Sequence, residues 1–290
     1  DLKVDTAALT NISRDHLDYH KDFKTYKKAK LKLFFNHLNE SGCAVLNDKI
    51  KDIEITKKRL RKKVKVITYG MSNSDVNIIK RKKYAVITIF KKKYLIYTNL
   101  NSFIELENLA CAIACSLSID VKIKKILTIL RKIINPPGRL QKVLNNNKNF
   151  KVYIDYAHTP EALKEVLISK TYNNKKPNVV FGCGGDRDKG KREKMGRIAN
   201  LYANRIYVTD DNPRFEDSSK IRQSILKYCK NHAIEIPERK KAIINAINDL
   251  KKNEVLIIAG KGHENFQIIK DISYPLDDYK IATKALREKL

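Results

Sequence analysis

The pattern of apolar and polar positions divides the chain into two parts. In the first part, apolar residues recur at helical spacing over 23–38, whereas residues 44–46, 64–68, 84–90 and 94–97 are β-rich. Two more helical patterns follow at 103–116 and 121–134. The segment Asn135-Pro136-Pro137-Gly138 cannot continue a helix, so we place a boundary there, between domains of residues 1–137 and 138–290.

The second part alternates regularly between strands and helices. Strands are predicted at 151–155, 178–181, 205–209 and 254–258, and helices at 160–168, 192–203, 218–228, 240–251 and 279–288. Almost continuously apolar strands are typical of a parallel sheet that is covered by helices on both faces. The second domain is therefore predicted to be a doubly wound, Rossmann-like α/β domain.

Polar clusters follow the four predicted strands of this part. They are Asp155-Tyr156-Ala157-His158 and residues 182–191, 210–214 and 260–264. Ligands of such folds bind beyond the carboxyl ends of the parallel strands. We therefore expect the four clusters to form one site.

Two of the clusters favour a small zwitterionic ligand. In Asp210-Asp211-Asn212-Pro213-Arg214, the Arg214 guanidinium suits a carboxylate and Asp211 could accept from an ammonium group. Glu264, at the end of Gly260-Lys261-Gly262-His263-Glu264, could also meet an ammonium group. The alternatives are a salt bridge that caps the next helix, and a packed or solvent-facing turn for His263.

The glycine-rich segment 182–191 lies between a buried strand and a helix. Its backbone N–H groups could approach an anion, and Arg187, Lys189 and Lys191 add positive charge. The segment matches neither GxxxxGK[ST] nor GxGxxG, so a glycine-rich turn with solvated charges is the other interpretation.

Composition narrows the possible partners. The 290 residues include 60 Lys+Arg and 32 Asp+Glu, a net charge of +28. Lysine outnumbers arginine by about three to one, and no aromatic platform accompanies the lysine runs, so solvated surface lysines are favoured over a nucleic-acid site. No apolar run approaches the ~20 residues of a membrane span. Five cysteines without a CxxC pair fit a reducing cytoplasm, and Cys111 and Cys115 should share a core face.

The first part contains a second chemical pattern. Residues 10–20, TNISRDHLDYH, hold two His and two Asp, which make a loose metal-binding signature. Lys30 follows on the predicted helix and by itself is typical of a solvated helix lysine.

Together these segments resemble the Mur ligase family, ATP-dependent enzymes that form amide bonds in peptidoglycan precursor synthesis. TNISRDHLDYH, YKKAK, ENLA, GRLQ, DYAHTPEAL, FGCGGDRDKGKR, TDDNPR and AGKGHE occur in the family's order over nearly the whole chain. The resemblance implies an α/β fold in which an incomplete central ATPase domain precedes the Rossmann-like C-terminal domain. DYAHTP, GCGGDRDKGKR and DNPR are most similar to diaminopimelate-adding members.

The resemblance also implies residue roles. His16 and Lys30 would bind Mg²⁺, the lysine as a CO2-derived carbamate that offers the oxygen ligands a hard cation prefers. Lys30 and His158 would be catalytic. The residues that would bind ATP are Asn108, Arg139 and Asp155. The residues that would surround the amino acid are Arg187, Asp211, Asn212, Arg214, Gly260 and Glu264, with Arg214 on the distal carboxylate.

The implied reaction joins an amino acid to a nucleotide-linked peptide. ATP would phosphorylate the D-glutamate side chain of UDP-N-acetylmuramoyl-L-alanyl-D-glutamate, and the amine of meso-2,6-diaminopimelate would attack the acyl phosphate. The implied protein is a cytoplasmic monomer of cell-wall synthesis, with no nucleic-acid or membrane partner. The alternatives are a lysine-adding family member, a non-catalytic remnant and a basic nucleic-acid-binding module.

The chain departs from the family's pattern at its beginning. It contains no GxxxxGK[ST] phosphate loop, nothing corresponding to a uridine-binding domain precedes Asp1, and the acidic Mg²⁺ ligand expected between that loop and the TN motif cannot be identified. We therefore expect the carboxyl-terminal part of a longer ligase, which alone would be inactive and would fold its central domain poorly.

Overall fold

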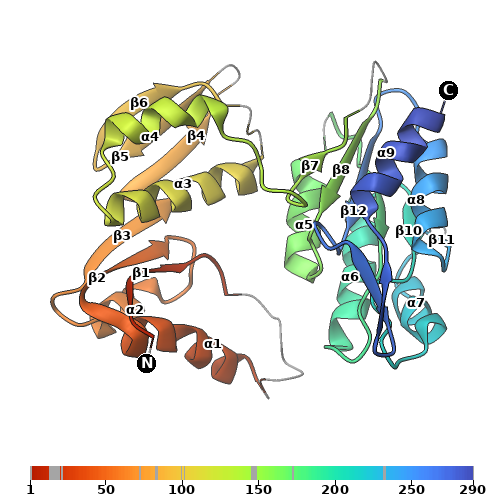
Figure 1. The fold of residues 1–290 in the computed structure, drawn as a ribbon, viewed down its shortest axis with the longest axis horizontal. Coiled ribbons are helices and arrows are strands. Elements are labelled where there is room, and N and C mark those ends of the chain that lie inside the picture. Colours follow the sequence, from red (N-terminus) through yellow and green to blue (C-terminus); the bar gives the residue numbers. More distant parts are fainter. Residues whose placement is uncertain are drawn as a thin grey trace. The chain divides into compact units, whose positions relative to one another are not determined.

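The computed structural model describes residues 2–12, 20, 22–71, 73–81, 84–98, 100, 102–144, 149–171, 173–230 and 233–289. The chain divides into two compact units, Asp1–Ile134 and Asn135–Leu290 (Figure 1). The division falls at the start of the Asn-Pro-Pro-Gly segment, where two prolines and a glycine interrupt regular structure.

The first unit is built on a six-stranded mixed sheet in which the strands lie in chain order. The strands are β1 (Val4–Leu9), β2 (Leu38–Asn47), β3 (Lys65–Gly70), β4 (Val76–Lys80), β5 (Ala85–Ile89) and β6 (Lys92–Ile96). Strands β1 to β4 pair in parallel and β4 to β6 antiparallel. The helices are α1 (Phe23–Lys32), α2 (Ile53–Arg59), α3 (Phe103–Ser118) and α4 (Ile123–Ile129), with a 3-10 turn at Leu130–Lys132.

Alternation along β2 and β3 gives this sheet two apolar faces. Val45 and Ile67 belong to the core with α3 and α4, whereas Ala44 and Leu46 pack with Leu31 of α1 on the other face. Two helices of this unit, α1 and α3, have side-chain caps at their amino-terminal ends. The Asp22 side chain accepts from Thr25 N–H, and Ser102 forms a capping box with Glu105 at the start of α3.

The helix predicted over 23–38 is wrong at its carboxyl end. The α-helix stops at Lys32, a π-helical turn covers Leu33–His37, and Leu38 begins β2. The turn keeps Phe34 and Leu38 buried while the chain changes from helix to strand. The helix predicted over 121–134 is likewise shorter, because α4 ends at Ile129.

The second unit is a doubly wound sheet, as expected. Its strands are β7 (Gln141–Lys142), β8 (Lys151–Asp155), β9 (Asn178–Phe181), β10 (Ile206–Val208), β11 (Ala233–Glu235) and β12 (Val255–Ala259), in the order β11-β10-β9-β12-β8-β7. All pairs are parallel except that of β7 with β8. A hairpin of β13 (Phe266–Ile269) and β14 (Ile272–Pro275) stands apart from this sheet.

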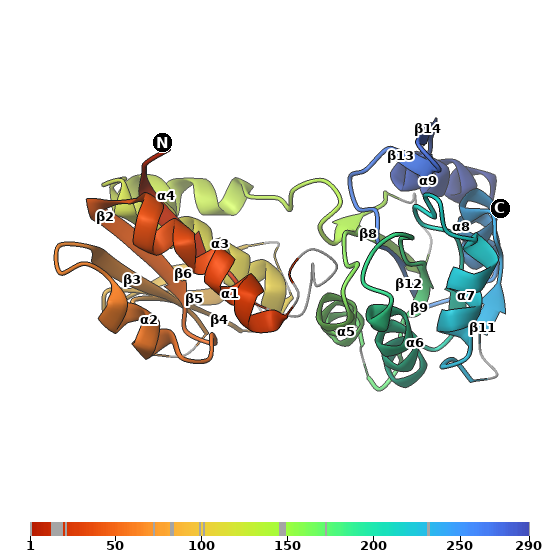
Figure 2. The ribbon, with the colours of Figure 1, turned by 90° about the horizontal axis from the view of Figure 1, so that it is seen from below.

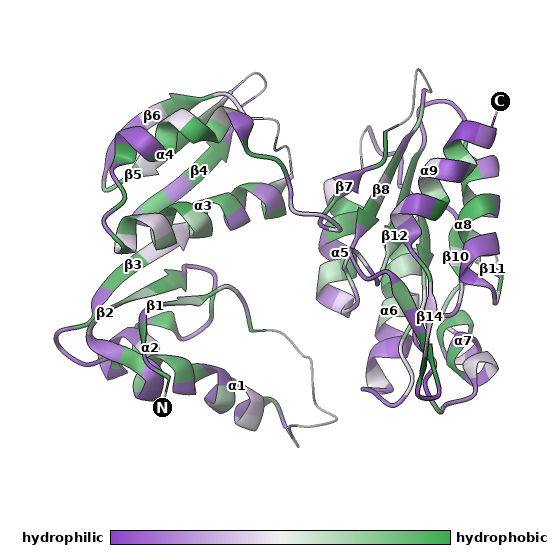
Figure 3. Ribbon diagram, in the orientation of Figure 1, coloured by the Kyte–Doolittle hydropathy of each residue, from purple (hydrophilic) through white to green (hydrophobic). Residues whose placement is uncertain are grey.

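Helices cover both faces of the second sheet (Figure 2). They are α5 (Pro160–Ser169), α6 (Gly190–Tyr202), α7 (Ser218–Leu226), α8 (Arg239–Asn248) and α9 (Asp278–Glu288). Val180, Leu256 and Ile258 pack on α8 and α9, while the alternate residues Phe181 and Ile257 are equally buried. Figure 3 shows these strands mostly hydrophobic and α8 and α9 banded, as burial of one helix face requires.

The cysteines and the lengths of the helices were also predicted from the sequence. Cys111 is buried and Cys115 packs against the same core, as their spacing predicts, and all five cysteines are free thiols. Within the described parts of the chain, no helix combines the length and the apolar character that crossing a bilayer requires.

Candidate functional site

Hydrogen bonds connect the loop that follows β9 to the loop that follows β10. Gly185 N–H donates to the Asn212 carbonyl at 2.9 Å, and Arg214 Nη1 donates to the Gly185 carbonyl at 2.8 Å. Asp186 Oδ2 accepts from Phe215 N–H at 3.0 Å. The glycine-rich segment therefore positions the Arg214 guanidinium.

Two glycines allow this close approach. A Cβ at Gly182 would lie 2.2 Å from the Thr209 carbonyl oxygen, and one at Gly185 would lie 1.9 Å from that of Pro213. No side chain fits at these distances, so the two loops can meet only with glycine here.

The loop after β12 approaches the same place. Gly260 has a φ of +114°, and a Cβ there would lie 2.8 Å from Asp211 Oδ2. The Asp211 carboxylate thus faces the bare backbone of Gly260. An ammonium group that binds this carboxylate could lie directly against that backbone.

Lys261, which sequence reasoning did not single out, is fully buried at the centre of this cluster. Its Nζ donates to Asn212 Oδ1 at 2.9 Å and lies 3.5 Å from Glu264 Oε2. Burial lowers the pKa of this ammonium, and the charges of Asp211 and Glu264 oppose the shift. A lysine between two glycines gives no local signal of burial, which only the fold reveals.

A buried ion pair supports the cluster from below. Arg239 donates to Asp278 through Nε at 2.9 Å and Nη2 at 2.7 Å, and Nη2 also reaches the Ala259 carbonyl at 2.9 Å. Burial opposes the charge of Arg239, but Asp278 raises its pKa overall. This pair anchors the end of β12, just before Gly260.

Tyr156 links the loop after β8 to the cluster. Its hydroxyl donates to Glu264 Oε1 at 3.4 Å, and burial, with the Glu264 charge, raises its pKa. The His158 ring packs edge-on against it at 4.7 Å and the His263 ring stacks on it at 5.6 Å. The Arg139 guanidinium lies 4.6 Å from the ring centroid. The structure therefore brings Arg139 and His158 together around one ring.

The Asp155 carboxylate is occupied by backbone donors. Its Oδ2 accepts from Leu140 N–H at 2.7 Å and its Oδ1 from Ala157 N–H at 2.8 Å. Burial raises its pKa, while these donors and Arg139 lower it. Asp155 thus fixes the turn that carries Arg139.

The start of α6 is basic and partly used for structure. Arg192 donates to the Gly184 carbonyl at 3.3 Å and pairs with Glu216 at 2.8 Å. Arg187 is exposed on the same loop, and Lys191 is buried. Asp210 forms an internal ion pair with Arg222 of α7, whereas the residue that caps this helix is Asp217.

The candidate residues of the first unit are less enclosed. Lys30 is exposed on α1 with its Nζ 5.4 Å from the Tyr26 ring, and the His20 ring lies 5.4 Å from the same ring. Asn108 is exposed on α3. His16 lies outside the described residues. Among those that are described, no three His, Cys, Asp or Glu side chains gather as a metal site would require.

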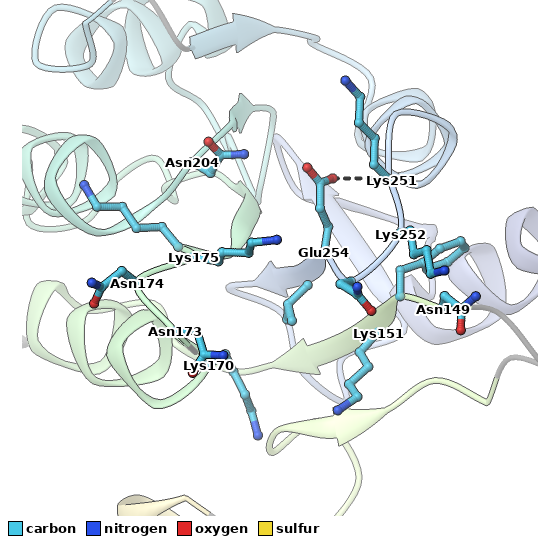
Figure 4. A pocket seen from close by; sticks show the side chains of 14 residues that line it. Asn149, Lys151, Lys170, Asn173, Asn174, Lys175, Asn204, Lys251, Lys252 and Glu254 are labelled. Atoms are coloured by element: carbon cyan, nitrogen blue, oxygen red, sulfur yellow. Dashed lines mark hydrogen bonds between the residues drawn. The ribbon is translucent and has the colours of Figure 1, made fainter.

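A basic hollow of about 870 Å³ lies at the opposite, amino-terminal ends of the strands in the second unit (Figure 4). Lysines line it, and the carboxylate among the described lining residues, Glu254, is taken by Arg205 at 2.5 Å and Asn178 at 3.1 Å. The hollow is therefore separate from the strand-end cluster.

The fold and the strand-end cluster define a two-unit α/β protein with a Rossmann-like site whose charges suit a small zwitterion. Two family models match the chain, the Mur ligase middle domain at residues 1–116 and the Mur ligase glutamate ligase domain at residues 138–262. The chain belongs to the Mur ligase family, and the family resemblance and the fold class inferred from the sequence are confirmed.

Individual relatives agree. The chain is 41% identical over 293 residues to the UDP-N-acetylmuramoyl-L-alanyl-D-glutamate–2,6-diaminopimelate ligase of Rickettsia bellii, covering 98% of this chain and 61% of that protein. A solved ligase of that name is 30% identical with a TM-score of 0.58, covering 99% of this chain and 61% of the other. The MurF ligase of Thermotoga maritima in complex with ADP, at 16% identity, has a TM-score of 0.69 over 99% and 62% of the two chains. The chain thus spans about three fifths of the length of these relatives.

Proposed function

We propose that this chain belongs to an ATP-dependent ligase that adds meso-2,6-diaminopimelate to UDP-N-acetylmuramoyl-L-alanyl-D-glutamate through an acyl phosphate, in cytoplasmic peptidoglycan synthesis. The observation that carries the proposal is the pairing of acceptors and donors at the strand ends. Asp211 borders the bare backbone of Gly260, and Lys261 lies between the Asn212 amide oxygen and Glu264. Arg214 Nη1 donates to the Asn212 carbonyl at 3.4 Å. The relatives' names support the same substrates.

The amino acid would bind by its distal end. Its ammonium would lie on Gly260 between the Asp211 and Glu264 carboxylates, and its distal carboxylate would accept from Arg214 and Asn212. Arg187, exposed on the adjoining loop, would complete the site. Holding the far end of the side chain leaves the other amine free to attack, and it fixes that amine's direction.

The nucleotide would bind near the other candidate residues. Arg139, stacked on Tyr156, and His158 would lie beside phosphates, and Asp155 would act by holding the Arg139 turn. In the first unit, Asn108 of α3 is the residue to which the family resemblance gives a role in ATP binding. ATP supplies the phosphoryl group that activates the peptide carboxylate.

His16 and a carbamylated Lys30 would hold Mg²⁺. Labelling of the chain with 13C-bicarbonate should give a carbamate signal. The Lys30→Arg variant should lose this signal, and the control variant Lys28→Arg should retain it.

The 290-residue chain contains no GxxxxGK[ST] loop, so we expect it alone to be inactive in ATP hydrolysis. Release of phosphate from ATP by the purified chain, above that of a Lys30→Arg variant, would contradict this expectation. A monomer is expected and can be checked by sedimentation.

The test of the proposed substrate is amino-acid binding by calorimetry. The chain should bind meso-diaminopimelate more tightly than L-lysine, which lacks the distal carboxylate. Arg214→Lys keeps the charge but loses the planar fork, and should reduce the preference by about tenfold. Equal or tighter binding of L-lysine by the unchanged protein would favour the lysine-adding alternative, and binding of neither amino acid would refute the proposal.

A further inference from the structure

The orientation of the Asn212 amide is fixed by two donors. Its Oδ1 accepts from Lys261 Nζ at 2.9 Å and from Ile268 N–H of β13, also at 2.9 Å. A side-chain amide whose oxygen faces two donors must present its NH2 group on the other side. Asn212 is 6% exposed, so this orientation is built into the fold.

Lys261 also sets the charge balance of the amino-acid site. Asp211 and Glu264 contribute two negative charges, and Arg214 and Lys261 contribute two positive charges, so these four groups sum to zero. The Arg239–Asp278 pair beneath them is neutral as a unit. Without the Lys261 ammonium the four positions would carry −1, which suits a lone ammonium better than an ammonium with an adjacent carboxylate.

We propose that Lys261 is a positioning residue that determines specificity, because it holds the Asn212 amide in its donor orientation and neutralises the acidic pair, so that the site prefers the zwitterionic end of diaminopimelate over the bare ammonium of lysine. The inference rests on the proposed function and adds a residue that does not itself touch the ligand. Its ammonium is fully buried and lies between the Asn212 oxygen and Glu264.

A purely structural role makes a different prediction. If Lys261 only supported the loops, its loss would weaken both amino acids alike, since both use the acceptor half of the site. If Lys261 acts as proposed, its replacement reduces the affinity for diaminopimelate, which carries the distal carboxylate, and not the affinity for lysine. The ratio of the two affinities therefore separates the roles.

The experiment compares the 290-residue chain with Lys261→Met by calorimetry, using meso-diaminopimelate and L-lysine as probes. We expect the dissociation constant for diaminopimelate to rise about tenfold or more and that for lysine to change by less than about threefold. Lys289→Met is the matched control. Lys289 donates to three backbone carbonyls that precede β12, at the end of this strand opposite to the site. Its loss should therefore lower the melting temperature without changing the ratio.

A second variant covers the case in which Lys261→Met does not fold. Asn212→Asp retains an oxygen for Lys261 and for Ile268 N–H but replaces the NH2 donor with a negative oxygen. The dissociation constant of this variant for diaminopimelate should rise by more than about tenfold, and its dissociation constant for lysine should not change.

The two hypotheses can fail separately. If the unchanged chain prefers diaminopimelate and Lys261→Met keeps that preference, or loses both amino acids equally, the role of Lys261 is refuted and the proposed function stands. If the unchanged chain does not bind diaminopimelate, both the proposed function and the role of Lys261 are refuted.

Discussion

Glu216 joins the glycine-rich loop to α6 through charge. One carboxylate oxygen accepts from Asp186 N–H at 3.0 Å and the other pairs with Arg192 at 2.8 Å. Burial raises the pKa of this carboxyl, but the Asp186 and Arg192 contacts outweigh burial and lower it overall. A carboxyl with a lowered native pKa stabilises the fold above its unfolded pKa, and that stabilisation is lost as the pH falls through the native value.

The Glu216→Gln variant tests this linkage. It keeps the size and one acceptor but loses the charge, so unfolding free energy should fall by about 1–2 kcal/mol at pH 7. At an acidic pH below its lowered native pKa, Glu216 becomes protonated and the difference in unfolding free energy should shrink towards zero. Urea unfolding at the two pH values measures both. A difference of the same size at both would show that the charge contributes nothing.

Single residues differ in how far the sequence reveals them. Asp211, Arg214 and Glu264 could be proposed because each follows a recognisable strand, and the strand ends do converge. Lys261 could not, since the partner that its buried ammonium binds, Asn212, is 49 positions away. The same holds for Arg239 and Asp278, which are 39 positions apart and begin two different helices.

The elements that carry the site are two loops held in contact, and neighbouring glycines in one of them test that contact. Gly185→Ala would place a Cβ 1.9 Å from the Pro213 carbonyl oxygen, whereas the Cβ of Gly184→Ala would lie 3.0 Å from a side-chain atom, Arg214 Nη1. We expect Gly185→Ala to cost about 3 kcal/mol of stability and to abolish diaminopimelate binding. Gly184→Ala should preserve stability and only weaken binding. Thermal melts and calorimetry distinguish them; equal, small effects would refute the close packing.

At this scale the sequence predicts regular elements well and irregular ones poorly. β8 and β9 have their predicted bounds because continuous apolar runs mark buried parallel strands. The short edge strands β7 and β11, of 2 and 3 residues, carry too little pattern to be recognised. The β13–β14 hairpin was also missed. It matters to the site, because Ile268 N–H and Gln267 of β13 both bind the loop after β10.

At the scale of the whole molecule, the hydrophobic cores lie within single units, which leads us to propose that each unit unfolds as its own domain. The poor folding that the sequence predicts for the first unit would then appear as an unfolding transition at the lower temperature. Ile78 and Ile247 are fully buried, one in the core of each unit. Ile78→Ala and Ile247→Ala should each cost about 2–5 kcal/mol. In scanning calorimetry, Ile78→Ala should lower the transition temperature of the first unit, and Ile247→Ala that of the second unit. A single transition shifted by both variants would contradict independent domains.

The net charge of +28 belongs to the whole chain and not to the site. Part of this charge lies in the basic hollow at the amino ends of the strands, whose lining includes the lysines 151, 170, 175, 176, 251 and 252. Phe150, the aromatic residue among its described lining, is buried, and Lys289 lies over its ring. Such a surface attracts phosphates without a ring on which a base could stack.

We therefore predict that nucleic acid binds only weakly and only at low salt. Filter retention of single-stranded DNA or RNA should be measurable at about 20 mM salt and absent near 150 mM, because affinity carried by counterion release alone falls steeply over that range. Substituting Lys175 and Lys176 with Gln should reduce the low-salt retention and leave diaminopimelate binding unchanged, since the hollow lies at the opposite ends of the strands. Tight retention near physiological salt would revive the nucleic-acid-binding alternative.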